Sequence, residues 1–187
     1  MKTYNINQLK NGIKITLSGE PYEIIENEFV KPGKGIGFTR VKLKNLLTEK
    51  IIERTFKSNE LIKESDIKEI SVQLLYSNGN ELYFMNNENY EEYTIAKNII
   101  EKEKIHWLIE QEFYNIILWN NKPINITIPK FIQTKIIDTT PSLKGESITG
   151  TKYATILNGY RIKVPLFIQT NQIIKIDTRS GLYVSKI

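Results

Sequence analysis

The sequence predicts an all-β protein built from small barrels or sandwiches. Short runs in which apolar and polar residues alternate recur along most of the 187 residues, a pattern typical of half-buried strands. Turn dipeptides separate these runs at intervals of roughly 8–12 residues, the spacing expected of barrels and sandwiches. Helical periodicity is limited to residues 93–109, where we expect one or two short helical turns.

The first third of the chain contains three predicted strands and one unusual turn. The strands cover residues 13–17, 22–26 and 38–44. The turn between the last two reads Lys31-Pro32-Gly33-Lys34-Gly35. Because proline fixes φ and glycine accepts backbone angles that other residues avoid, we expect a tight, protruding turn with Lys34 at its tip.

The strand after this turn is predicted to present a basic face. Its inward residues alternate with an outward set, Phe38, Arg40, Lys42 and Lys44. A lysine held on a stiff hairpin above such a face is suited to an anionic partner. The same residues are also compatible with an ordinary solvated turn. A nucleotide-binding phosphate loop is excluded, because strand alternation rather than a helix follows the glycines.

The rest of the chain repeats the pattern of short strands and turns. Asn78-Gly79, between residues 72–76 and 82–85, is a strong hairpin signal. Further strands are predicted at residues 124–128, 162–168, 174–177 and 182–184. In the last turn Asp177 is expected to accept backbone N–H bonds, which would leave Arg179 projecting toward a phosphate. An ordinary hairpin turn is an equally good interpretation of this segment.

Charge divides the chain into three segments, with boundaries at a polar stretch and at Pro129. Residues 1–64 carry 12 Lys/Arg and 8 Asp/Glu, residues 65–128 carry 5 and 10, and residues 129–187 carry 9 and 3. The net charges are therefore +4, −5 and +6, which sum to the +5 of the whole chain. Two basic ends around an acidic middle favour contact with a polyanion at two places, although such values are also ordinary for soluble domains.

The inventory of reactive residues argues against an enzyme. The chain has one histidine, His106, and no cysteine, so neither a zinc site nor a nucleophile–base pair can be assembled from the usual residues. We expect a structural role for His106, no catalytic residues, no metal and no cofactor. The absence of cysteine also suits a reducing cytoplasm.

Exposed aromatic residues are a second possible route to nucleic-acid binding. Tyr76, Tyr83, Phe84 and Tyr160 are candidates for stacking on bases. Strand alternation should bury about half of such residues, and a place in the core is the better expectation for any one of them.

Ten segments of the sequence carry a resemblance to a known family. They are residues 28–35, Phe38, 40–46, 55–58, Leu75-Tyr76, 83–85, Tyr90-Glu91, Lys152 with Ala154-Thr155, 164–168 and 176–183. In this order, and over essentially the whole chain, the sequence resembles bacterial elongation factor P. That family is related to the archaeal and eukaryotic hypusine-containing translation factors.

The resemblance implies a fold and a function. The fold is an SH3-like (KOW-type) barrel at residues 1–64 followed by two OB-fold barrels at residues 65–128 and 129–187, in an elongated L shape. The function is that of a cytoplasmic, monomeric translation factor that binds both ribosomal subunits, between the peptidyl and exit sites, without a membrane. Its partners would be peptidyl-tRNA and ribosomal RNA. Such a factor promotes peptide-bond formation at consecutive prolines by positioning peptidyl-tRNA.

The resemblance also implies the site residues. Lys34 matches the family's loop tip and is expected to carry a modification added by a lysine-modifying enzyme. The residues expected to contact tRNA or the ribosome are Lys31, Pro32, Gly33, Lys34, Gly35, Arg40, Lys42, Lys44, Arg179 and Tyr183. Ile36 and Gly37 depart from the family, which usually has a small or polar residue and then alanine, so the loop can differ in its dynamics.

Two other functions compete with this interpretation. A general single-stranded RNA-binding barrel protein, such as an RNA chaperone, would account for the basic ends and the aromatics but not for a single projecting lysine. Competition between free single-stranded RNA and ribosomes would discriminate between the two. A small β-barrel hydrolase is disfavoured by the missing nucleophile–base pairs.

Overall fold

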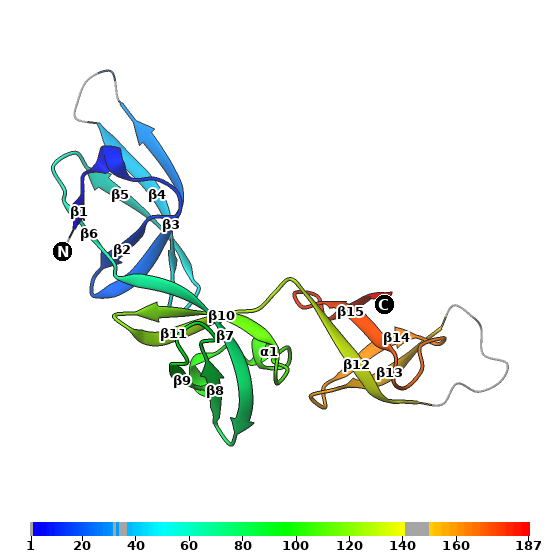
Figure 1. The fold of residues 1–187 in the computed structure, drawn as a ribbon. Coiled ribbons are helices and arrows are strands. Elements are labelled where there is room, and N and C mark those ends of the chain that lie inside the picture. Colours follow the sequence, from blue (N-terminus) through cyan, green and yellow to red (C-terminus); the bar gives the residue numbers. More distant parts are fainter. Residues whose placement is uncertain (1, 32, 34–36, 141–149) are drawn as a thin grey trace. The chain divides into compact units, whose positions relative to one another are not determined.

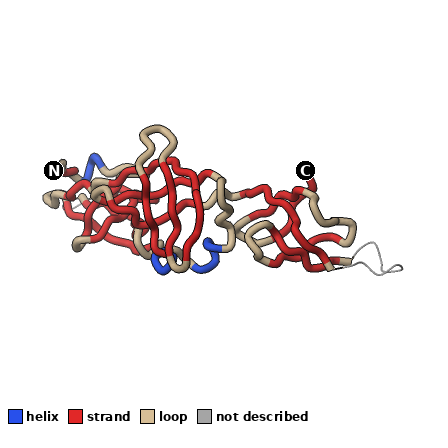
Figure 2. The backbone as a smooth tube through the Cα atoms, turned by 60° about the horizontal axis from the view of Figure 1, so that its bottom comes forward, coloured by secondary structure: helices blue, strands red, loops and turns tan. Residues whose placement is uncertain are grey.

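The computed structural model describes residues 2–31, 33, 37–140 and 150–187. Strands make up 58% of these residues and helices 6%, which confirms the predicted all-β class. The chain divides into two compact units, residues 1–70 with 116–125 and residues 71–115 with 126–187. The strands form curled sheets, with the short helical segments at strand ends (Figure 2).

The first sheet has six antiparallel strands in the order β1-β6-β2-β3-β4-β5 (Figure 1). Its elements are β1 (Thr3–Tyr4), η1 (Ile6–Gln8), β2 (Lys14–Leu17), β3 (Glu20–Val30), β4 (Phe38–Asn45), β5 (Ile51–Lys57) and β6 (Ile62–Glu64). The predicted strands at residues 13–17, 22–26 and 38–44 are therefore confirmed. β3 is longer than predicted, because residues 27–30 continue to pair with β4 without being buried in the core.

The core of the first unit lies under β2, β3 and β4. β4 alternates as predicted, with Thr39, Val41 and Leu43 buried and the basic residues facing outward. Further apolar side chains complete the core, namely Ile6, Leu9, Ile15, Tyr22, Ile24, Phe56 and Ile62. This face fixes the register of β4 and hence the direction of its outward side chains.

The middle sheet has five strands in the order β11-β10-β7-β8-β9. They are β7 (Ile67–Asn78), β8 (Glu81–Met85), β9 (Glu92–Ala96), β10 (Phe113–Trp119) and β11 (Lys122–Thr127). The predicted hairpin is present, but its turn residues are Gly79 and Asn80, one position later than expected. The shift has a physical cause: a bulge between Leu74 and Tyr76 moves the β7–β8 register, so that Asn78 pairs with Glu81.

The predicted helical segment contains two short helices, η2 (Lys97–Ile99) and α1 (Lys102–Ile105). This confirms the expected one or two turns. The first part of the predicted segment is instead the end of β9, because Ile95 is fully buried in the sheet that β8 and β9 form.

The third sheet has five strands in the order β14-β13-β12-β15-β16. They are β12 (Phe131–Thr139), β13 (Thr151–Ile156), β14 (Arg161–Pro165), β15 (Ile173–Asp177) and β16 (Leu182–Lys186). Its core includes Ile136, Ile156, Val164 and Ile174, and Trp107 and Ile109 pack into the same cluster. The division into domains at residues 1–64, 65–128 and 129–187 stays a prediction.

Candidate nucleic-acid interface

The hairpin formed by β3 and β4 supports the loop that the sequence singles out. The two strands pair from Tyr22 opposite Asn45 to Val30 opposite Phe38, which places the loop directly after the last pair. Pro32, Lys34 and Gly35 lie outside the described residues. Lys31 and Gly33 are exposed. Gly33 does not have a left-handed φ, so the expected unusual backbone angle is not found there. No described atom lies within 4 Å of the position that an added Cβ would occupy.

The base of this loop is closed by Phe29 and Ser58. A Cβ atom on Gly37 would lie 2.9 Å from Cζ of Phe29 and 3.5 Å from the carbonyl oxygen of Val30. The hydroxyl of Ser58 donates a hydrogen bond to the carbonyl oxygen of Gly37. The absence of a side chain at Gly37 therefore lets the Phe29 ring lie against the backbone. The alternation of residues along the sequence did not predict these roles for Phe29 and Ser58, because both residues contact Gly37 from distant positions in the chain.

Carboxylates accompany the basic face of β4. Lys42 Nζ lies 2.7 Å from Glu26 and Lys44 Nζ lies 3.3 Å from Glu49. Arg40 lies 4.0 Å from Glu28. The hydrogen bond from Lys42 to Glu26 raises the pKa of this lysine. The face thus carries alternating charges rather than the purely basic character that the strand alone suggested.

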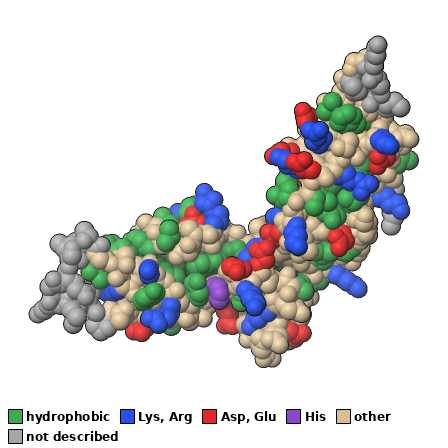
Figure 3. All heavy atoms as spheres, turned by 180° about the vertical axis from the view of Figure 1, so that it is seen from behind, with side chains coloured by type: hydrophobic (Ala, Val, Ile, Leu, Met, Phe, Trp, Pro, Cys, Tyr) green, Lys and Arg blue, Asp and Glu red, His purple; other side chains and the backbone are tan. Residues whose placement is uncertain are grey.

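This mixed character follows from the pairing of β3 with β4. Glu26 faces Lys42 and Glu28 faces Arg40 across the ladder, and cross-strand pairs of opposite charge are favourable neighbours. Figure 3 shows Lys/Arg and Asp/Glu side chains interspersed over the visible face of the first unit. The glutamates in residues 23–28 were the sequence signal from which these ion pairs could have been predicted. Their partners could not be assigned, because the pairing depends on a register shift between Ile24 and Glu26.

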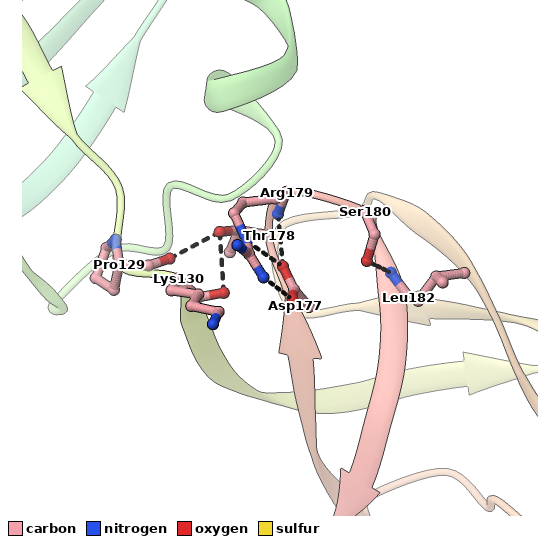
Figure 4. A network of polar contacts seen from close by, with 7 residues as sticks. All are labelled: Pro129, Lys130, Asp177, Thr178, Arg179, Ser180 and Leu182. Carbon is pink, nitrogen blue, oxygen red and sulfur yellow. Dashed lines mark hydrogen bonds and ion pairs between the residues drawn. The ribbon is translucent and has the colours of Figure 1, made fainter.

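The turn between β15 and β16 is closed by Asp177 (Figure 4). Asp177 Oδ1 accepts the backbone N–H of Arg179 at 3.0 Å, and its carbonyl accepts the N–H of Gly181 at 2.8 Å. Gly181 has a φ of 68°, a left-handed angle that glycine adopts without cost. Thr178 Oγ1 donates to the carbonyl of Pro129 at 2.7 Å. The predicted backbone bonds to Asp177 are therefore present.

Arg179 folds back onto this turn instead of projecting freely. Its Nη2 lies 2.8 Å from Asp177 Oδ2 and its Nε lies 3.2 Å from Asp177 Oδ1. These bonds to Arg179 lower the pKa of Asp177 to about 2. The side chain of Arg179 nevertheless remains 65% exposed, so it is accessible to a ligand. Tyr183 is half-buried and makes an edge-to-face contact with Phe167.

The aromatic candidates occupy several different environments. Phe84 is fully buried in the core. The rings of Tyr76 and Tyr83 stack with their centroids 4.6 Å apart, and the Tyr83 hydroxyl donates a hydrogen bond to the carboxylate of Glu81. Tyr160 stacks on the exposed His106 at 4.3 Å, and the structural role of this histidine stays a prediction. None of these four rings is combined with a cation over its face in the described residues.

Two features are absent from the described part of the chain: a cluster of metal ligands and a helix able to span a membrane. Residues 2–31, 33, 37–140 and 150–187 contain no group of three His, Cys, Asp or Glu side chains placed to hold a metal ion. In the same residues, no helix has the length and apolar character that crossing a membrane requires.

Three family models match consecutive parts of the chain. The elongation factor P KOW-like domain matches residues 5–62, the elongation factor P OB domain matches residues 67–126, and the elongation factor P C-terminal domain matches residues 132–186. The matches follow one another in the family's order and leave only short gaps.

Solved structures share the fold. Eukaryotic translation initiation factor 5A from Methanococcus jannaschii aligns with a TM-score of 0.54 at 23% identity, covering 68% of this chain and 92% of that one. A translation initiation factor eif-5a family protein from Naegleria fowleri aligns with a TM-score of 0.53 at 15% identity, covering 67% and 95%. The KOW-like and OB matches confirm the tandem-barrel fold. The three matched domains show that this chain belongs to the elongation factor P family, whose members are translation factors that act with the ribosome and are not enzymes.

Proposed function

We propose that this chain binds the ribosome between the peptidyl and exit sites and promotes peptide-bond formation at consecutive prolines by positioning peptidyl-tRNA. The observation that carries the proposal is the β3–β4 hairpin. Its long antiparallel ladder ends directly at the segment containing Lys34, and Phe29 and Ser58 close the base of the loop. β4 also pairs with β5 along its length, so the loop is attached to two interior strands, each of which has a partner strand on both sides.

A rigid attachment suits a factor that acts through position. Proline is a hindered nucleophile, and a mispositioned peptidyl-tRNA increases the entropic part of the barrier to attack. Holding the reactants in the productive arrangement lowers that part without any acid–base or covalent chemistry. In this proposal the ribosome performs the peptide transfer, and Lys34 reaches the end of the tRNA.

The side chain of Lys34 is proposed to be lengthened by a modification. An unmodified lysine adds only four methylenes and an amine beyond its Cα, which is short for entering a deep ribosomal cleft. A primary amine can be acylated or alkylated by a modifying enzyme, and either change extends its reach; acylation removes the charge of the amine, whereas alkylation keeps it. We place this modification in the cytoplasm and propose that the factor acts as a monomer.

The remaining proposed contacts lie on two hairpins. Lys31, Pro32, Gly33 and Gly35 flank Lys34, and Arg40, Lys42 and Lys44 follow on β4. Arg179 and Tyr183 belong to the β15–β16 hairpin. We propose that the first group faces peptidyl-tRNA and the second faces ribosomal RNA.

Reconstituted translation tests the proposal. The readout is the yield of a reporter with three consecutive prolines, measured with and without the native modified protein, against a matched reporter without prolines. We expect the protein to raise the yield of the proline reporter selectively. An equal effect on both reporters would favour a general RNA chaperone, and no effect on either would remove the proline-specific function.

A further inference from the structure

A second candidate nucleic-acid surface lies on the hairpin formed by β13 and β14 (Figure 1). The strands pair with Tyr153 opposite Lys163 and Thr155 opposite Arg161. Their inner face is buried, as shown by Ala154 and Val164. Tyr153, Arg161 and Lys163 therefore share the outer face, and all three are exposed. The backbone beneath them is held, because Thr140 donates two hydrogen bonds to the carbonyl of Tyr153.

Two cations lie against one aromatic ring on this face. The guanidinium carbon of Arg161 is 5.0 Å and Nζ of Lys163 is 5.7 Å from the centroid of the Tyr153 ring. These distances are within the range of cation–π attraction. Tyr153 is 47% exposed and Arg161 is also exposed, so the ring and the guanidinium plane present flat, polarisable surface to solvent.

Tyr153, Arg161 and Lys163 form the β13–β14 group, and few acidic residues lie near it in the sequence. Between Glu146 and Asp177 the sequence has no Asp or Glu but four Lys or Arg. Within the described residues neither Arg161 nor Lys163 has a carboxylate within 4.0 Å. In the described residues these cations therefore form no ion pair, in contrast to the cations on the mixed face of β4.

The other described cation–aromatic groups lack one of these properties. The ring of Phe56 is buried beside Arg54. Tyr4, beside Lys2, is hydrogen-bonded to Glu64. Lys130 and Lys175 flank Phe131, but Asp177 lies directly across the ladder from this ring. Among the cation–aromatic groups described, the β13–β14 group has the most exposed aromatic residue, Tyr153 at 47% against 39% for Phe131, and neither of its two cations lies within 4.0 Å of a described carboxylate.

We propose that Tyr153, Arg161 and Lys163 form a binding platform for an unpaired nucleotide of single-stranded RNA. A base stacks on the tyrosine ring or the guanidinium plane, and the cations meet the neighbouring phosphates. RNA is the partner that a translation factor meets, and stacking requires a base that is not paired. The platform rests on family membership rather than on the proposed activity at prolines.

Oligonucleotide binding by the full chain tests this platform. The probe is fluorescently labelled decauridylate RNA, and the readout is anisotropy at several salt concentrations. We expect Tyr153→Leu to weaken binding about tenfold, because one stacked base is lost. The double variant Arg161→Gln with Lys163→Gln should reduce the slope of log affinity against log salt by about 1.4, since each single-stranded phosphate contact contributes about 0.7.

Matched controls separate stacking from other effects. Tyr76→Leu alters a tyrosine of nearly equal exposure, 48%, in a setting with no cation over its ring, and should leave binding unchanged. Lys135→Gln removes one exposed charge from β12 and serves as the charge control. Tyr153→Phe keeps the ring and should bind as wild type. Each variant is first shown to have the wild-type urea midpoint. If Tyr153→Leu does not fold, Tyr153→Phe remains as the test, because loss of binding in that variant would overturn the platform.

Three results would overturn the platform. The first is wild-type affinity in Tyr153→Leu, or the loss of binding in Tyr153→Phe. The second is an equal effect of Tyr153→Leu on an RNA duplex of the same length, because a duplex has no free base to stack. The third is a wild-type salt dependence in the double variant Arg161→Gln with Lys163→Gln, because the two cations would then make no phosphate contact. The oligonucleotide assay contains no ribosome. A negative result in it would therefore reject the platform without bearing on the proline reporter, and a negative reporter result would not reject the platform.

Discussion

The ring of Phe29 occupies the space that a side chain on Gly37 would need, with Cζ only 2.9 Å from the position of an added Cβ. Real Cβ atoms do not approach other atoms this closely, so one of the two residues must change if Gly37 gains a side chain. The φ of Gly37 lies outside the left-handed region, which means that the backbone itself accepts alanine. The conflict is therefore between two side chains and not with the chain's conformation.

A double-mutant cycle tests this relationship. Gly37→Ala should stabilise the protein by about 0.4–1 kcal/mol in a Phe29→Ala background, because alanine reduces the entropy of the unfolded chain. In wild type the same substitution should gain less or destabilise, because the exposed Phe29 ring must move away. Urea unfolding of the four proteins gives the coupling free energy. Equal effects of Gly37→Ala in both backgrounds would contradict the contact.

The carboxylates beside the β4 cations are expected to weaken RNA binding. Glu26→Gln with Glu28→Gln should increase affinity for ribosomes and steepen its salt dependence, since Lys42 and Arg40 would lose their partners. The free energy of unfolding should change by less than about 1 kcal/mol, because exposed ion pairs contribute little. Ribosome pelleting at several salt concentrations measures the first effect. An unchanged salt dependence would place the RNA contact elsewhere.

Asp177 should titrate at unusually low pH. Its pKa is about 2 because Arg179 binds its charged form, so the stabilising effect of the pair is complete above the ordinary value of 3.8 and is lost as the pH falls toward 2. Carbon NMR of the Asp177 carboxyl group measures this midpoint. Arg179→Ala should raise it toward the ordinary value, and a midpoint that does not move would show that Arg179 is not the cause.

Tyr114 is expected to stabilise the segment that carries Trp107. Its buried hydroxyl accepts the N–H of Ile109 at 2.7 Å and donates to the carbonyl of Trp107 at 3.1 Å. Tyr114→Phe should lower the free energy of unfolding by about 1–3 kcal/mol, because a buried N–H loses its acceptor. Urea unfolding at pH 7 measures the loss, and a change below about 0.5 kcal/mol would argue against it.

The same residue predicts a response to high pH. Burial raises the pKa of Tyr114 to about 12. A raised pKa means that the stabilisation is complete below the ordinary value of 10.0 and is lost as the pH rises to about 12. Tyr114→Phe should lack this contribution to the alkaline loss of stability. Identical pH profiles between 10 and 12 would contradict the assignment.

The order of apolar, polar and turn residues along the sequence was sufficient to predict the alternation of β4 and the turn at Asp177, because both depend on residues close in sequence. It was insufficient wherever a bulge sets the register. The partners of Arg40 and Lys42 depend on the irregularity after Ile24, and the β7–β8 turn is displaced by the bulge before Tyr76.

Contacts between residues far apart in sequence were also beyond local pattern. His106 was expected to be structural, but its stacking partner Tyr160 lies more than 50 residues later, in the connection between β13 and β14. The cations over Tyr153 come from the neighbouring strand, so strand pairing had to be known before they could be grouped.

The central claim is that Lys34 acts through its primary amine. The most direct measurement is the yield of the three-proline reporter, relative to the proline-free control, with wild type, Lys34→Arg and Lys34→Ala. Arginine keeps the charge but presents a planar guanidinium that is a different nucleophile. We predict that Lys34→Arg loses the proline-specific effect almost as completely as Lys34→Ala, while all three proteins have the same urea midpoint. Wild-type yield with Lys34→Arg would show that charge alone suffices and would contradict the account.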